Sequence, residues 1–183
     1  AFSQKSIANG VRLSLPVALS VFAYGSVYGV LAGQAGLTAW QAALMSATVF
    51  AGSAQFVILD MWTHPLPLAA IAITTLAVNS RHALMGTALH PWLCELPPGR
   101  AYGLLFFLND ESWALTLSRL HAEEDDLGFY AGSVALIWLT WVAATATGAL
   151  LGEAIGDPAV WGLDFAFVAV FLSLLVFLWR GKG

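Results

Sequence analysis

Long apolar stretches constrain the fold of this 183-residue chain more than any other feature. They cover residues 13–35, 39–62, 67–92, 101–120, 129–152 and 159–179, with short polar breaks between them. A helix needs about 20 mostly apolar residues to cross a hydrocarbon core of about 30 Å, and in lipid the backbone satisfies its polar groups within helices. The pattern therefore predicts an all-α polytopic membrane helix bundle of about six spans, with residues 1–183 forming one integral membrane domain.

Composition supports a membrane protein and argues against several other classes. Hydrophobic residues make up 59% of the chain and charged residues 10%, against about 25% charged in a soluble domain. The net charge is −4 and the basic residues are scattered, so we expect no nucleic-acid partner. Cys94 is the single cysteine, which argues against an internal disulfide and a thiolate metal site.

The distribution of basic residues predicts an orientation in the membrane. With six spans and a cytoplasmic N-terminus, most of them fall on the cytoplasmic side, as the positive-inside rule requires: Lys5, Arg12, Arg119, Arg180 and Lys182. Arg100 is then the external exception. We therefore expect both termini to lie inside.

Glycines in the first stretch predict close helix packing and a repeat. Gly25, Gly29 and Gly33 are four residues apart, which places them on one helix face where a second backbone can approach. The run from Gly29 to Gly33 is echoed by the run from Gly148 to Gly152. A period of about 120 residues fits the duplicated halves that are common in transporters.

Four ionisable residues lie inside the predicted spans: Arg81, His82, Asp110 and Glu111. An Arg or Asp at the centre of a membrane helix costs about 2.5–3.5 kcal/mol unless it is paired or hydrated. We expect Arg81 to pair with Asp110 or with Glu111. Adjacent helical residues point about 100° apart, so both acids cannot face Arg81 squarely. Either this pair only fixes the packing of two helices, or it belongs to a functional site.

Interruptions of the apolar pattern favour the functional site. The stretch 39–62 weakens around residues 50–56, and the stretch 67–92 is interrupted at residues 79–82. We expect both helices to be discontinuous at mid-membrane, where free backbone groups bind ionic solutes. A third polar cluster, residues 109–112, lies at the centre of the stretch 101–120. Together they predict one central site for a small solute.

These motifs resemble a known family. Residues 50–56 read Phe-Ala-Gly-Ser-Ala-Gln-Phe, residues 79–82 read Asn-Ser-Arg-His, and residues 110–112 read Asp-Glu-Ser. In this order and spacing they are similar to the AzlC family, the large subunit of bacterial branched-chain amino-acid exporters, over nearly the whole chain. Ser80 departs from the apolar residue usual in the family. Relatives commonly continue past the equivalent of Gly183, so we expect either a C-terminally truncated chain or a short member.

The resemblance implies export of branched-chain and other hydrophobic amino acids across the bacterial cytoplasmic (inner) membrane. It also implies a partner, a small hydrophobic membrane subunit of the AzlD type.

A zwitterionic amino acid needs a donor for its carboxylate, an acceptor for its ammonium and an apolar pocket. We expect Arg81 or the amides of Gly52 and Ser53 to bind the carboxylate, Asp110 or Glu111 to bind the ammonium, and Phe50, Phe56 and Met85 to line the pocket. The candidate substrate-binding residues are Phe50, Gly52, Ser53, Gln55, Asn79, Arg81, Asp110 and Glu111. Those for proton coupling are His82, Asp110 and Glu111.

Two other function classes remain open. Ser53 and His82 together are reminiscent of the serine–histidine dyad of an intramembrane hydrolase. A channel or a non-transporting scaffold subunit is the other alternative. His82 and His90 have no third ligand nearby, so we assign no metal. We also assign no cofactor, and we expect a protein that is not an enzyme.

Overall fold

The computed structural model describes residues 2–122, 126–155 and 160, and every regular element within them is helical. The predicted sixth span and the acidic residues 123–125 lie outside this part of the chain. The helices are α1 (Gln4–Gln34), α2 (Ala39–Val49), α3 (Gly52–Asp60), α4 (Leu68–Asn79), α5 (Arg81–Leu93), α6 (Pro98–Phe106), α7 (Asp110–His121) and α8 (Leu127–Ile155). Three stretches of the described chain form helices long and apolar enough to cross a membrane: Gln4–Gln34, Leu68–Leu93 and Leu127–Gly152. The predicted all-α membrane bundle is confirmed.

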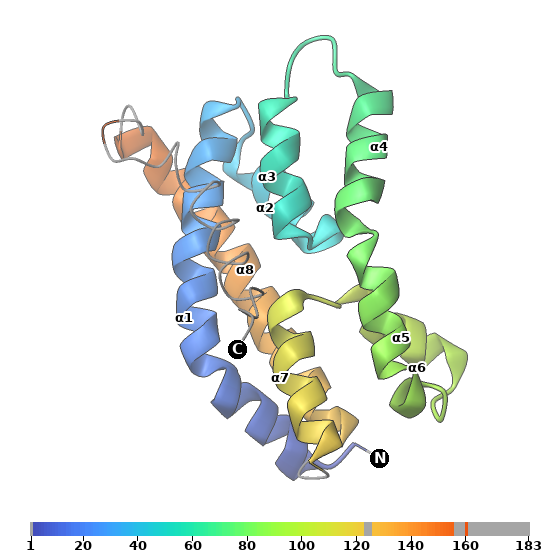
Figure 1. Ribbon diagram of the computed structural model, residues 1–183. Coiled ribbons are helices and arrows are strands. Elements are labelled where there is room, and N and C mark those ends of the chain that lie inside the picture. Colours follow the sequence, from blue (N-terminus) through green and yellow to red (C-terminus); the bar gives the residue numbers. More distant parts are fainter. Residues whose placement is uncertain (1, 123–125, 156–159, 161–183) are drawn as a thin grey trace, which may run out of the picture.

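The long helices α1 and α8 pack side by side and run in the same direction (Figure 1). The predicted glycine face of α1 is part of their contact. A Cβ on Gly25 would lie 2.9 Å from the Cβ of Ala144, and one on Gly29 would overlap the carbonyl of Thr145. Small residues on both helices therefore let the two backbones approach closely, as in other membrane helix pairs.

Contacts between α1 and α8 are exchanged at a constant sequence offset. Gly29 faces Thr145, and Ser26 faces Gly148. Residue 145 lies 119 positions after Ser26, and residue 148 lies 119 positions after Gly29. Each of these two contacts therefore becomes the other when the two helices are interchanged. The pair thus has a local twofold arrangement in the register of the predicted repeat.

Segment 39–62 is not one spanning helix. Thr38 and Gln41 form a capping box that starts α2, and Phe50 ends it in the left-handed conformation with φ of 40°. The chain then turns into α3. With 11 and 9 residues, α2 and α3 are about 16 and 14 Å long, too short to cross a bilayer. Figure 1 shows that the α1–α2 and α3–α4 connections lie at the same end of the molecule, so this segment folds back on itself.

Segment 101–120 is also divided, into α6 and α7. The side chain of Asn109 accepts a hydrogen bond from the backbone N–H of Ser112 at 2.9 Å and caps the start of α7. The α5–α6 and α7–α8 connections lie together at the end of the molecule that carries the N-terminus (Figure 1). We expected one span each for segments 39–62 and 101–120, but the structure divides each of them into two short helices. Apolar content does not distinguish one long helix from two short ones.

Segment 67–92 runs through the molecule as α4 followed by α5. Its predicted interruption is slight, because Ser80 has φ of −55° and ψ of −28°, which are helical values. Arg81 begins α5, so it lies near the middle of the 26-residue stretch Leu68–Leu93.

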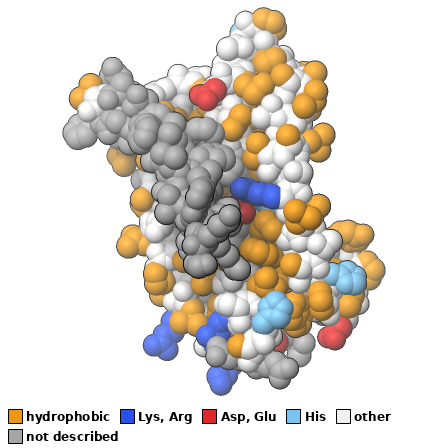
Figure 2. Space-filling view, in the orientation of Figure 1, with side chains coloured by type: hydrophobic (Ala, Val, Ile, Leu, Met, Phe, Trp, Pro, Cys, Tyr) orange, Lys and Arg blue, Asp and Glu red, His pale blue; other side chains and the backbone are white. Residues whose placement is uncertain are grey.

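Basic side chains gather at one end of the molecule. Apart from Arg81, the Lys and Arg residues of the described chain are Lys5 and Arg12 near the start of α1, Arg100 at the start of α6 and Arg119 near the end of α7. All of these ends lie on the side of the N-terminus (Figures 1 and 2). Arg100 therefore lies at the same end as the other basic residues, and not on the opposite side of the membrane as the six-span topology predicted. The folded-back segments change the side on which it lies.

Candidate functional site

A cavity lies where the breaks of α2–α3, α4–α5 and α6–α7 meet, between α1 and α8. Its volume is about 100 Å³, counted as the positions open to the centre of a water molecule. One water needs roughly 10–15 Å³ of such space, so several waters or a small solute fit. The lining residues are Val21, Tyr24, Phe50, Ala51, Gly52, Ser53, Arg81, His82, Asn109, Asp110, Glu111, Ile137 and Trp141. The structure thus brings the three polar interruptions to one place.

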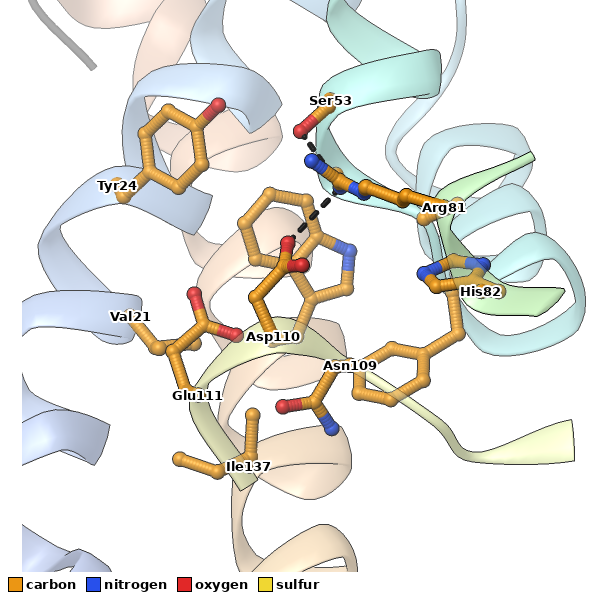
Figure 3. Close-up of a pocket in the computed structure, with 13 residues that line it drawn as sticks. Val21, Tyr24, Ser53, Arg81, His82, Asn109, Asp110, Glu111 and Ile137 are labelled. Atoms are coloured by element: carbon orange, nitrogen blue, oxygen red, sulfur yellow. Dashed lines mark hydrogen bonds and ion pairs between the residues drawn. The ribbon is translucent and has the colours of Figure 1, made fainter. Parts of the chain in front are cut away.

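Arg81 holds two of the breaks together. Its Nη2 lies 2.9 Å from Oδ2 of Asp110, and the same nitrogen donates to Oγ of Ser53 at 3.1 Å (Figure 3). These bonds join the starts of α3, α5 and α7. The ion pair is about one-third exposed, with side-chain values of 32% and 34%, so it borders the cavity. The sequence left both Asp110 and Glu111 as possible partners of Arg81, and in the structure the partner is Asp110.

Glu111 points away from that pair. Figure 3 shows its carboxyl on the side of Val21 and Tyr24, while Asp110 turns to Arg81. Within the described chain, Glu111 makes no hydrogen bond or ion pair with another residue. When Glu111 is ionised and His82 is neutral, the cavity carries one uncompensated negative charge, because Asp110 neutralises Arg81. Such a cavity attracts a positively charged group.

The start of α3 at Gly52, by contrast, favours a negatively charged group. The N-terminus of α3 has no side-chain cap, and its first residues, Gly52 and Ser53, line the cavity. Free backbone N–H groups at a helix N-terminus bind anions. The start of α7, by contrast, is capped by Asn109 and carries Asp110 and Glu111 in its first turn. The cavity therefore has an electropositive side at α3 and an electronegative side at α7.

Apolar walls complete the cavity, and some of them were not predicted. Phe50 was expected, whereas Val21 and Tyr24 on α1 and Ile137 and Trp141 on α8 were not. The sequence signal for the two α1 residues is weak: Val21 lies four residues before Gly25 of the glycine face, and Tyr24 lies three residues after Val21. Tyr24 stacks on Phe56 with 4.6 Å between ring centroids, and this stacking fixes the ring at the cavity wall.

Gln55 and Asn79 do not line the cavity. Gln55 is fully buried in a polar network: its Nε2 donates to Ser46 Oγ at 3.1 Å, and its Oε1 accepts from Trp141 Nε1 at 3.1 Å. It thus holds α2, α3 and α8 together. Asn79 lies two residues before Arg81, and its Oδ1 is buried without a partner in the described chain.

Phe56 and Met85 also lie outside the cavity lining. Phe56 packs behind Tyr24, and Met85 belongs to a separate apolar cluster with Leu89 and Leu93. Their expected role in an apolar pocket is therefore wrong for this cavity, because both side chains are used in packing.

Ser53 and His82 share the cavity but do not form a dyad. Ser53 Oγ is bonded to Arg81, and no hydrogen bond joins it to His82 in the described residues. A nucleophilic serine needs a base within hydrogen-bond reach, so this geometry argues against the hydrolase.

Comparison with known proteins agrees with the motifs. The profile of the family described as AzlC protein matches residues 16–155. The inner membrane protein YgaZ of Escherichia coli is 28% identical over 94% of this chain and 73% of its own length. The branched-chain amino acid transport protein AzlC of Bacillus subtilis is 29% identical over 92% of this chain and 67% of its own.

An uncharacterized membrane protein of Archaeoglobus fulgidus is 31% identical over 94% of this chain and 76% of its own length. No solved structure matches the chain. Because the family profile matches residues 16–155, which include every residue that lines the cavity, the chain belongs to the AzlC family.

Proposed function

We propose that this protein transports branched-chain and other hydrophobic amino acids across the membrane and binds them in the cavity between the helix breaks. The observation that carries the proposal is the arrangement of that cavity. It has free helix amides on one side, an unpaired carboxylate on the other and apolar walls between. A zwitterion with a small apolar side chain is complementary to all three features.

Relatives support the same substrate class. The similar Bacillus subtilis protein is named for branched-chain amino acid transport, and its similarity extends over 92% of this chain. Family membership also favours a transport protein over an enzyme or a scaffold subunit.

The two charged ends of the amino acid have separate partners in this proposal. Glu111 binds the ammonium, since Asp110 is already engaged by Arg81. The N–H groups of Gly52 and Ser53 bind the carboxylate at the start of α3. Arg81 is then a positioning residue that holds the three helix starts, and Phe50 contacts the apolar side chain.

Coupling to protons would use the same carboxylate. Protonation of Glu111 removes the charge that holds the ammonium, so a proton and a substrate compete for one site. His82 also lines the cavity and has no ion-pair partner in the described chain. Export driven by proton entry follows from this competition.

We also propose an inner membrane location with the N-terminus inside. The clustering of Lys5, Arg12, Arg100 and Arg119 at the N-terminal end of the bundle supports this orientation through the positive-inside rule. A small hydrophobic subunit of the AzlD type is the proposed partner.

Binding and counterflow of labelled L-valine test the function. We expect the purified protein to bind L-valine and proteoliposomes to show counterflow. Glu111→Gln should weaken binding by about 10-fold or more, because a charged hydrogen bond contributes about 1.5–3 kcal/mol. Asp60→Asn, an exposed acid at the end of α3, is the matched control and should bind normally. Normal binding and counterflow by Glu111→Gln would contradict the proposed site.

A further inference from the structure

Tyr24 carries a hydroxyl that the fold does not use. Its oxygen is buried and has no hydrogen-bond partner in the described chain. Leaving a buried hydroxyl unpaired costs about 1–3 kcal/mol, so such a group calls for a partner such as a water, an ion or a bound solute. Tyr24 lines the cavity, so a molecule bound in the cavity is the nearest candidate for that partner.

The ring of Tyr24 is held firmly while its hydroxyl is left free. It stacks on Phe56 at 4.6 Å, with 9° between the ring planes, and it contacts Trp141 at 5.5 Å. Gly25, the next residue, packs tightly against Ala144 and Trp141, so α1 cannot easily rotate. The position of the hydroxyl is therefore preorganised.

Direction and chemistry assign this hydroxyl to one end of the amino acid. Figure 3 shows it turned toward Ser53, in the first turn of α3, while the Glu111 carboxyl lies farther from it in this view, between Val21 and Asp110. A tyrosine hydroxyl donates to an anion, and that side of the cavity has the free helix amides. Arg81 Nη2 is already engaged by both Asp110 and Ser53, and its Nε is a second buried donor without a partner in the described chain.

We infer that Tyr24 is a specificity-determining residue whose hydroxyl donates a hydrogen bond to the substrate carboxylate. This inference rests on the proposed function and extends it. This hydrogen bond lets the protein distinguish an amino acid from the corresponding amine, because a bound amine leaves the Tyr24 hydroxyl and the α3 amides unpaired.

The test compares two ligands and two variants by calorimetry. The ligands are L-valine and isobutylamine, which is valine without its carboxylate. The variants are Tyr24→Phe and Tyr28→Phe. Tyr28 is the matched control, because it lies one turn away in the same aromatic cluster, yet its hydroxyl bonds to Met45 Sδ at 3.3 Å and it does not line the cavity.

We expect Tyr24→Phe to weaken L-valine binding by about 10-fold or more and to leave isobutylamine binding unchanged. Tyr28→Phe should leave both unchanged. The thermal midpoint of Tyr24→Phe should equal or exceed that of the wild type, because the removed oxygen has no partner in the protein.

Each other outcome overturns the inference. Unchanged L-valine affinity in Tyr24→Phe excludes the contact, and an equal loss for both ligands excludes the carboxylate as its partner. A lowered thermal midpoint would show that the hydroxyl has a structural partner. If the wild type binds no L-valine, the proposed function itself fails, which this experiment distinguishes from a failure at Tyr24.

Discussion

At the scale of single residues, the two adjacent acids of α7 have different tasks. Asp110 pairs with Arg81, whereas Glu111 has no such bond in the described chain. Removing one member of a fully buried pair costs about 3–5 kcal/mol, and exposed pairs contribute less than about 1. For a pair about one-third exposed, we expect Asp110→Asn to lower the free energy of unfolding by about 1–3 kcal/mol.

Glu111→Gln is the matched comparison, because it makes the same chemical change one residue away. We expect it to alter stability by less than about 0.5 kcal/mol while it weakens L-valine binding by about 10-fold or more. Denaturation midpoints of both variants in one detergent check this difference. Equal loss of stability in the two variants would contradict the separation of roles.

The pairing of Arg81 with one of the two acids could be predicted from the sequence. The energetic cost of an unpaired Arg81 in lipid predicted its pairing, and the neighbouring positions of Asp110 and Glu111 predicted that only one acid faces it. Which acid does so depends on where α7 starts, and that is set by the Asn109 cap. Tyr24 was missed because an aromatic residue in an apolar helix gives the same signal whether it packs or binds.

At the scale of elements, the α1–α8 contact depends on glycine. A methyl group at Gly29 would overlap the carbonyl of Thr145, while one at Gly33 would meet the carbonyl of Ala149 at an ordinary 3.7 Å. We expect Gly29→Ala to destabilise the protein by about 1–3 kcal/mol, the usual cost of overpacking, and Gly33→Ala to be tolerated.

Thermal midpoints and the yield of monodisperse protein measure this contrast. Because both variants add one methyl to the same helix, their helix propensities change equally. A Gly29→Ala protein as stable as Gly33→Ala would show that the two helices pack less closely than described.

The sequence predicted this glycine face but not the folding-back of α2–α3 and α6–α7. Hydropathy records how apolar a stretch is, and two half-length helices are as apolar as one long helix. The reversals depend on Phe50, which adopts a left-handed conformation, and on Asn109, whose side chain caps the next helix. Neither residue type identifies such a turn by itself. The polar cluster at residues 50–56 indicated the break in the stretch 39–62, whereas the break predicted at residues 79–82 is slight and none was predicted in the stretch 101–120.

At the scale of the whole molecule, the folded-back segments determine which side of the membrane each connection faces. Cys94 is exposed in the α5–α6 connection, and Thr63 is exposed in the α3–α4 connection. Six spans with an internal N-terminus would place Cys94 outside and Thr63 inside. The structure places Cys94 at the same end as the N-terminus and Thr63 at the opposite end (Figure 1).

A membrane-impermeant maleimide applied to intact cells separates these topologies. With the N-terminus inside, we expect the native Cys94 to resist labelling and to react only after permeabilisation. Thr63→Cys in a Cys94→Ala background should react in intact cells. Labelling of Cys94 but not of residue 63 in intact cells would restore the six-span arrangement.

The central claim is that the amino acid binds in the cavity where the breaks meet, and substrate protection tests it most directly. Ala51 lines this cavity and its side chain makes no hydrogen bond, so Ala51→Cys in a Cys94→Ala background introduces a thiol there. Thr63→Cys in the same background is the control outside the cavity. We expect saturating L-valine to slow modification of the cysteine at position 51 by methyl methanethiosulfonate several-fold, and to leave position 63 unaffected. Equal rates at position 51 with and without L-valine, in a protein that still transports L-valine, would contradict the account.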